Sequence, residues 1–112
     1  LRPERVVWHQ STRTHKRFYW LAVETPVAGS KVVVERRGQA IHILEAKGLA
    51  NLTLRLDDSM VDLDLPVVVV QGEKVLFDGL LSRSSEVIRK TLAERGDPTG
   101  IWTAQVTVEL NR

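Results

Sequence analysis

The most strongly patterned stretch of the chain is IWTAQVTVEL, residues 101–110. Its even-numbered residues are all apolar, and its odd-numbered residues from Thr103 to Glu109 are all polar or charged. Because successive side chains of a strand point to opposite faces, this period of two predicts a β-strand with one buried and one wet face. One strand cannot bury its apolar face alone, so the rest of the chain must supply its partners.

Two segments in the first half of the chain are candidate partners. Residues 31–35 are rich in valine, and a turn candidate at Gly38 leads directly into the apolar segment 40–44, so we expect a hairpin. Within 49–56, leucines alternate with polar residues such as Arg55, which predicts a further strand with one wet face.

The middle of the chain predicts another hairpin. Four consecutive valines at 67–70 indicate a strand that is buried on both faces or lies in the core of a sandwich. Residues 71–74 include a glycine and suit a tight turn, after which 75–77 returns antiparallel and residues 80–81 extend the chain.

One helix is predicted over residues 84–95. Serines at its first positions can cap it, and Ile88 and Leu92 lie four residues apart on one face. Gly96 ends the helix, and Pro98 prevents its resumption.

These elements, together with apolar runs at 5–8 and 18–23, predict a mainly-β fold. About seven to nine short strands with frequent turn signals are typical of an immunoglobulin-like antiparallel β-sandwich. A small barrel is the alternative architecture. The chain lacks the Cys…Trp…Cys pattern of true immunoglobulin domains. We therefore expect residues 1–112 to form a single β-sandwich domain with one short helix.

Composition excludes several classes of protein. A length of 112 residues fits one domain, and the absence of cysteine excludes disulfide scaffolds, thiolate zinc sites and thiol catalysis. No apolar run approaches the roughly 20 residues that span a bilayer, and no signal peptide opens the sequence. The chain begins at Leu1 and not at an initiator methionine. We therefore expect it to be part of a longer protein.

Charge is distributed unevenly along the chain. Residues 1–37 contain eight Lys/Arg and three Asp/Glu, whereas residues 38–82 contain three and seven, and residues 83–112 contain five and four. This split predicts either internal complementarity or two differently charged surfaces. The net charge of +2 is too small for a dedicated nucleic-acid binder, so we expect no nucleic-acid partner.

Candidate catalytic residues carry little signal. No Gly-x-Ser-x-Gly elbow is present, and Gly29-Ser30 lacks the second glycine. His9, His15 and His42 form neither a helical i, i+4 pair nor a cluster in the sequence. We therefore predict no catalytic residue, no cofactor-binding residue and no transition-metal ligand in this chain.

Four aspartates form an acidic loop between two predicted strands, at Asp57, Asp58, Asp62 and Asp64. Their oxygens could be presented to calcium, although the EF-hand spacing is absent. The alternative is that these carboxylates accept hydrogen bonds from neighbouring backbone N–H groups in turns. The sequence leaves both interpretations open.

Aromatic residues are few, and we expect most of them in the core. The six are Trp8, Phe18, Tyr19, Trp20, Phe77 and Trp102. Phe18-Tyr19-Trp20 must divide between two faces of a strand, so one of these rings can be exposed and serve recognition. His15-Lys16-Arg17 precedes them, which suits a basic-aromatic patch or simply a solvated strand end.

Several sequence signatures occur together in a fixed order. They are Val7-Trp8, Tyr19-Trp20-Leu21, LDDSMVDLDLPV at 56–67, VLFDG at 75–79 and TLAERGDP at 91–98. In this order they resemble the C-terminal β-sandwich domain of certain bacterial α/β-hydrolases, which are esterase-, phospholipase- or prolyl-oligopeptidase-like. The resemblance runs from about Arg5 to Leu110, and Gln71-Gly72 departs from an expected Asn-Gly turn.

The resemblance implies a non-catalytic accessory domain at the C-terminus of a longer chain. The catalytic serine, acid and histidine would lie upstream, so the parent protein would be a serine hydrolase and the partner its own hydrolase domain. It also implies an extracellular or periplasmic location. The alternative hypothesis is an independent carbohydrate- or protein-binding adhesion module that uses exposed aromatic residues.

Overall fold

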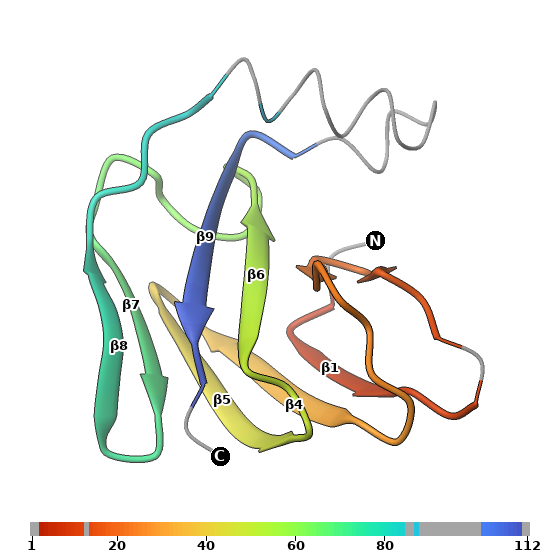
Figure 1. Ribbon diagram of the computed structural model, residues 1–112. Coiled ribbons are helices and arrows are strands. Elements are labelled where there is room, and N and C mark those ends of the chain that lie inside the picture. Colours follow the sequence, from red (N-terminus) through yellow and green to blue (C-terminus); the bar gives the residue numbers. More distant parts are fainter. Residues whose placement is uncertain (1–2, 13, 85–86, 88–101, 111–112) are drawn as a thin grey trace.

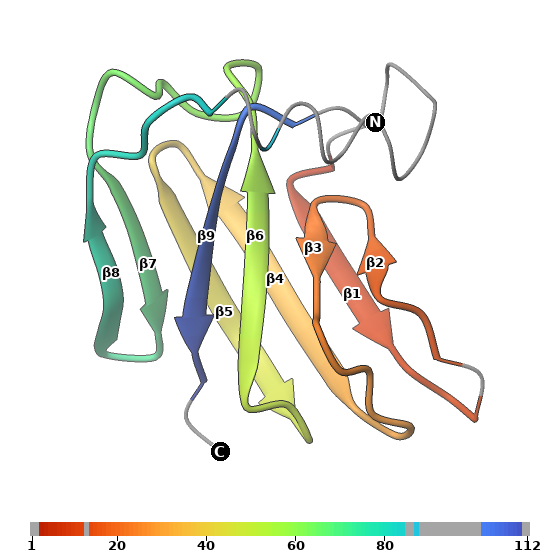
Figure 2. The ribbon, with the colours of Figure 1, turned by 45° about the horizontal axis from the view of Figure 1, so that its top comes forward.

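The computed structural model describes residues 3–12, 14–84, 87 and 102–110, which form nine strands in two sheets. The strands are β1 (Arg5–His9), β2 (Arg17–Phe18), β3 (Leu21–Ala22), β4 (Lys31–Arg37), β5 (Ala40–Lys47), β6 (Asn51–Leu56), β7 (Val67–Gln71), β8 (Lys74–Gly79) and β9 (Ala104–Glu109). The larger sheet has the order β1-β4-β5-β7-β8, and the smaller has the order β2-β3-β6-β9. Figure 1 and Figure 2 show β6 and β9 in front of β4 and β5. The predicted mainly-β sandwich is confirmed.

Both predicted hairpins are present. In the β4–β5 hairpin Arg37 lies opposite Ala40, and in the β7–β8 hairpin Gln71 lies opposite Lys74. Each turn has two residues, and the first is a glycine with positive φ, 60° at Gly38 and 61° at Gly72. Glycine adopts this conformation without the steric cost that a Cβ brings, so the predicted turns form where the sequence places glycine.

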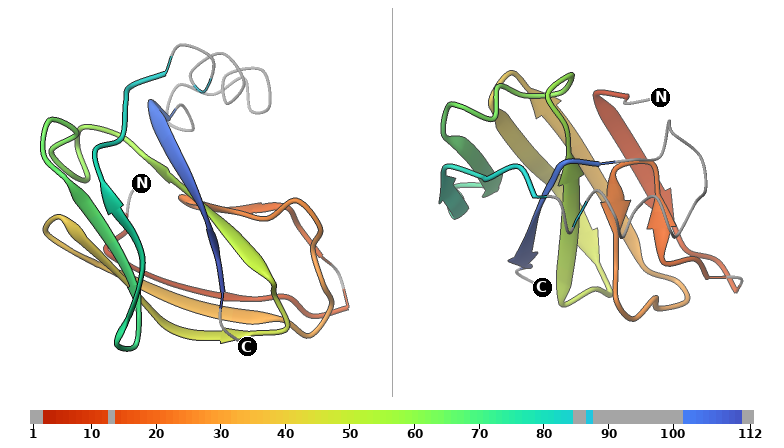
Figure 3. Two further views of the ribbon diagram at one scale, coloured as in Figure 1. Left: turned by 60° about the vertical axis from the view of Figure 1, so that its left-hand side comes forward. Right: turned by 90° about the horizontal axis from the view of Figure 1, so that it is seen from above.

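One strand pairing departs from the predicted antiparallel arrangement. β5 and β7 run parallel, with Ile41 opposite Val69 and Ile43 opposite Gln71. The reason is the path of the chain: β6 crosses to the smaller sheet between them, so β7 returns beside β5 without a hairpin. The left view of Figure 3 shows β6, in yellow-green, in a separate layer from β1, β4 and β5. Parallel neighbours require such a crossover connection.

The predicted strand over 18–23 is wrong. Residues Arg17–Phe18 (β2) and Leu21–Ala22 (β3) instead pair antiparallel with each other, and Tyr19-Trp20 forms the turn between them. Tyr19 has a φ of 53°. An uninterrupted apolar run suggested one strand, but the left-handed backbone at Tyr19 reverses the chain and sends Trp20 into the core.

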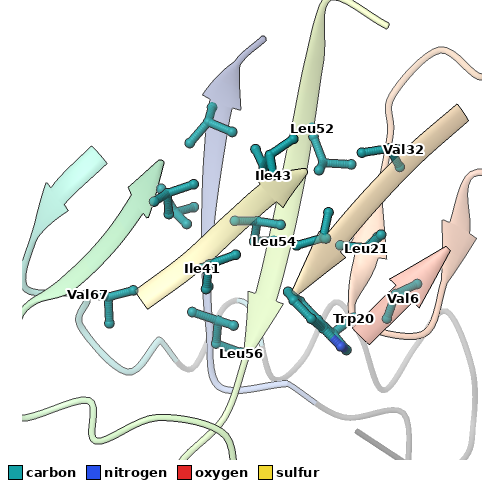
Figure 4. Packing of buried hydrophobic residues seen from close by; sticks show 14 of the residues in the cluster. Val6, Trp20, Leu21, Val32, Ile41, Ile43, Leu52, Leu54, Leu56 and Val67 are labelled. Carbon is teal, nitrogen blue, oxygen red and sulfur yellow. The ribbon is translucent and has the colours of Figure 1, made fainter. Parts of the chain in front are cut away.

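The core lies between the two sheets. It forms there because apolar and polar side chains alternate along the strands, so that the apolar ones share the inner face. Figure 4 shows Ile41 and Ile43 of the larger sheet facing Leu52, Leu54 and Leu56 of the smaller one. All apolar residues at even positions from Trp102 to Leu110 are buried, as the alternation predicts. Burial of an aliphatic side chain stabilises the fold by about 1.5–3 kcal/mol, so this interface is the main source of stability.

Two local predictions about burial have different outcomes. Val67 and Val69 are fully buried, whereas Val68 and Val70 are only half-buried, so of the two alternatives for the valine strand the sandwich core is confirmed and burial on both faces is wrong. It belongs to a sandwich with one sheet on each side of the core, and its outer face has no covering layer among the described residues. Arg55, predicted on a wet face, is only 6% exposed.

The C-terminal part of the predicted pattern is only partly described. Strand β8 ends at Gly79, so residues 80–81 do not continue it. The helix predicted over 84–95 falls on residues 85–86 and 88–95, which lie outside the described residues. At its predicted start, Ser84 Oγ accepts a hydrogen bond from Val87 N–H at 3.3 Å, which is the geometry of an N-cap.

Candidate functional site

The acidic loop between β6 and β7 is organised by two of its own aspartates. Asp57 Oδ1 accepts hydrogen bonds from Ser59 N–H at 2.9 Å and from Ser59 Oγ at 2.5 Å. Asp62 Oδ1 accepts one from Asp64 N–H at 2.9 Å. Both are turns in which a carboxylate bonds the backbone two residues ahead. The interpretation of these carboxylates as turn-forming groups is therefore confirmed at Asp57 and Asp62.

The other two aspartates are joined by one arginine. Arg83 Nε lies 3.1 Å from both Oδ1 and Oδ2 of Asp58, and Arg83 Nη2 also donates to Asp58. Arg83 Nη1 lies 3.0 Å from Asp64 Oδ1. The hydrogen bond from Arg83 holds the pKa of Asp58 below its usual range, and the two carboxylates raise the pKa of the guanidinium.

A glutamine in the β4–β5 turn holds the same loop from the other side. Gln39 Oε1 accepts a hydrogen bond from Asp62 N–H at 2.6 Å, and Gln39 Nε2 donates to the Asp62 carbonyl oxygen at 2.8 Å. Between these polar contacts, Met60, Val61 and Leu63 point into the core. The loop thus covers one end of the sandwich. Its polar outer residues fix a backbone whose apolar residues are buried.

The contact between Arg83 and Asp58 predicts an acid-dependent contribution to stability. Because the pKa of Asp58 is lowered in the folded protein, the contribution is fully present above the pKa of the unfolded chain and is lost as pH falls through the folded-state value. We expect Arg83→Gln to lower the melting temperature by a few degrees at pH 7. Below about pH 4 this difference should shrink and disappear. Thermal unfolding of both proteins across the pH range measures it, and a difference that stays constant down to pH 2 would contradict it.

Calcium binding by the acidic loop is disfavoured by these contacts. Among the described residues, no three His, Asp or Glu side chains lie close enough together to hold a metal ion. Arg83 supplies the positive charge between Asp58 and Asp64. We expect the melting temperature to be the same in calcium and in chelator, since only an ion that binds the folded state raises it. A rise that grows with calcium concentration would contradict this expectation.

Among the described residues, Ser30 lies beside the end of β1, where Gln10 N–H donates to its carbonyl oxygen at 2.8 Å. His9 is exposed at the end of β1, and His42 lies on β5 opposite Glu35. The His15 backbone is held by Gln10, whose side chain accepts from His15 N–H at 2.9 Å and donates to the His15 carbonyl oxygen at 2.6 Å. Ser30 is 1% exposed.

Three arginines in the first third of the chain pair with acids of the same segment. Glu35 contacts Arg37 at 2.7 Å and Arg5 at 3.6 Å, and Arg36 lies 3.8 Å from Glu4. The hydrogen bond from Arg37 lowers the pKa of Glu35, with further lowering from the charge of Arg5. These three arginines therefore pair with acids of residues 1–37, whereas Lys31 pairs with Glu45 at 3.3 Å and the acidic loop pairs with Arg83.

An exposed aromatic cluster lies at the edge of the sandwich where β1 and β2 approach each other. The Trp8 and Phe18 rings stack with centroids 5.8 Å apart, and the Phe18 and Tyr19 rings meet at 75° with centroids 4.7 Å apart. Trp8 is buried, whereas Phe18 is 36% and Tyr19 is 43% exposed. We call Phe18 and Tyr19, supported by Trp8, the aromatic corner. The prediction that one ring of this segment is exposed is confirmed, because Phe18 and Tyr19 are exposed and Trp20 is buried.

The backbone of Tyr19 is costly for a tyrosine. A bulky residue held at a φ of 53° destabilises the folded state by of order 1 kcal/mol relative to a residue that tolerates the left-handed region. We therefore expect Tyr19→Asn to leave the free energy of unfolding of the 112-residue chain within about 0.5 kcal/mol of wild type, because relief of strain offsets the lost ring contact. Urea unfolding measures it. A loss above about 2 kcal/mol would show that the ring is needed for folding.

The residues that assemble these sites were largely outside the sequence predictions. Arg83 and Gln39 lie 25 and 23 residues from their main partners, and no local pattern links them. Gln10 is likewise a buried residue that holds a loop, with no signal in its sequence context. Long-range polar contacts of this kind depend on the fold and not on spacing.

Comparison with known proteins identifies no similar protein. No family model, no curated protein and no solved structure matches the chain. Within the described residues, no helix is long and apolar enough to cross a membrane.

Proposed function

We propose that the chain is a non-catalytic accessory domain that packs on an upstream α/β-hydrolase domain of the same protein and modulates it. The parent protein would be an esterase-like serine hydrolase with an extracellular or periplasmic location. The sandwich would be of the immunoglobulin-like type. The resemblance of the ordered signatures to such domains is the source of this proposal.

The observation that supports the proposal is that the acidic loop forms a structural part of the sandwich. The segment LDDSMVDLDLPV at 56–67 is the most specific part of the resemblance. Its carboxylates accept hydrogen bonds from their own backbone or from Arg83, and its apolar side chains enter the core. The motif therefore builds one end of the sandwich. A segment with this structural role is what we expect in a domain that packs on another domain and does not itself catalyse a reaction.

The test begins with the gene. A reading frame that continues upstream of Leu1 into an α/β-hydrolase with a Gly-x-Ser-x-Gly elbow is expected, and a frame that starts just before Leu1 would overturn the proposal. The purified 112-residue chain should not hydrolyse short-chain nitrophenyl esters above the buffer rate. Turnover that is abolished by a single serine substitution would also overturn it.

A second candidate function has its own observation. The aromatic corner exposes two rings that lie at 75° to each other. Exposed rings of this kind can bind sugar rings or apolar protein groups. On this hypothesis the chain is an independent carbohydrate- or protein-binding module. Titration of the isolated chain with oligosaccharides, followed by tyrosine and tryptophan fluorescence, distinguishes it. Saturable binding that Tyr19→Asn abolishes supports this second candidate.

A further inference from the structure

Pro3, the first described residue, is attached to the turn that carries the aromatic corner. Trp20 Nε1–H donates a hydrogen bond to the carbonyl oxygen of Pro3 at 2.8 Å. The Glu4 carbonyl oxygen accepts from Arg36 N–H at 2.7 Å, which continues the attachment towards β1. Because Trp20 directly follows Tyr19 in the β2–β3 turn, Pro3 is bound to the residue next in sequence to the exposed Tyr19.

The two exposed rings of the aromatic corner are less buried than Trp8 and Trp20, the core residues beside them. Strands β2 and β3 pair over only two residues each, and the turn between them holds Tyr19 in a strained conformation. Strain of this kind persists where a function requires the side chain in that position. Here the strained residue presents its ring to solvent next to Phe18, so the geometry favours contact with something outside the described residues.

We infer that the aromatic corner is the surface that the preceding α/β-hydrolase domain covers, an inference that rests on the proposed function. A domain joined upstream of residue 1 is tethered on this side of the sandwich, through Pro3. Tethering gives an effective concentration in the millimolar range, so two exposed rings suffice for a contact that would be too weak between separate molecules. Apolar groups of the hydrolase domain would pack on the exposed faces of Phe18 and Tyr19.

The opposite edge of the larger sheet supplies a matched control. Val75 on β8 is 56% exposed and Leu80 just after it is 65% exposed, so both are at least as accessible as the two rings. Strand β8 is the edge strand at the other end of the sheet order from β1. A domain tethered through Pro3 should cover the aromatic corner and leave this second apolar pair exposed.

The experiment compares two double variants of the two-domain parent protein. One carries Phe18→Ser and Tyr19→Ser, and the other carries Val75→Ser and Leu80→Ser. The rate at which a protease cuts the junction before Pro3 reports how tightly the domains are docked. We expect cleavage to be several-fold faster in the first variant and unchanged in the second. The same variants of the 112-residue chain, measured by thermal unfolding, correct for any loss of stability within the sandwich.

The outcomes separate this inference from the proposed function. Equal cleavage of both variants and wild type, with a hydrolase domain present upstream, overturns the inference and leaves the proposed function standing. Faster cleavage of the Val75 and Leu80 variant alone moves the interface to β8 and also overturns it. A reading frame without a hydrolase domain overturns both. If the Phe18 and Tyr19 variant fails to fold, Tyr19→Asn takes its place, because it keeps Phe18 on Trp8.

Discussion

Replacement of Trp20 by alanine is expected to lower the free energy of unfolding by about 4 kcal/mol. Trp20 is fully buried, and its ring nitrogen donates to Pro3 at 2.8 Å while its carbonyl oxygen accepts from Arg55 N–H at 2.8 Å. Alanine keeps the backbone contact but leaves a large cavity and an unsatisfied Pro3 carbonyl. Small domains have a total stability of about 5–15 kcal/mol, so the loss is a large fraction of it.

Urea unfolding at constant pH measures this effect. Val75→Ala is the control, because Val75 is 56% exposed and its truncation should change stability by less than about 0.5 kcal/mol. Trp20→Phe should fall between the two, since it keeps most of the ring and loses the hydrogen bond. A loss below about 1 kcal/mol for Trp20→Ala would mean that this side chain is not in the core.

Replacement of Leu54 by alanine is expected to cost about 3 kcal/mol. Leu54 is fully buried on β6, between Leu21 of β3 and Val106 of β9 in the register of the smaller sheet. The adjacent residue Thr53 points to the other face, where its hydroxyl lies 2.8 Å from that of Thr107. Thr53→Ala should therefore cost less than about 1 kcal/mol.

This pair of variants tests the two-faced character of the sheet. Adjacent positions on one strand are compared, so the length of the strand and its position in the sheet are the same for both. Chemical unfolding of both proteins gives the two values. Equal losses at Leu54 and Thr53 would contradict the register, because a slip of one residue exchanges the two faces.

Strand alternation made most of the fold predictable. The leucines of 49–56 and the even positions of 101–110 became the inner face of the smaller sheet, and the glycines at 38 and 72 marked two real turns. Such signals are local, since they depend only on the side-chain period of a strand and on the freedom of glycine at positive φ. They say where strands begin and end better than they say which strands become neighbours.

What could not be predicted depends on contacts distant in sequence. The parallel pairing of β5 with β7 arises because β6 leaves for the other sheet, which no single segment encodes. The turn at Tyr19 was hidden because tyrosine rarely takes a positive φ. Of the two interpretations that the sequence left open for the acidic loop, turn formation is confirmed at Asp57 and Asp62. Arg83, the partner of the other two aspartates, lay beyond any local pattern.

We propose that this chain packs on another domain and does not itself catalyse a reaction, with the aromatic corner as the contact surface. Hydrogen exchange tests that claim most directly, because it reads the backbone at the surface itself. The exchange of amides at 17–22 and at 74–79 is compared between the 112-residue chain and the proposed parent protein. We predict several-fold slower exchange at 17–22 in the parent and no change at 74–79. Identical exchange at 17–22 in both proteins would contradict the account.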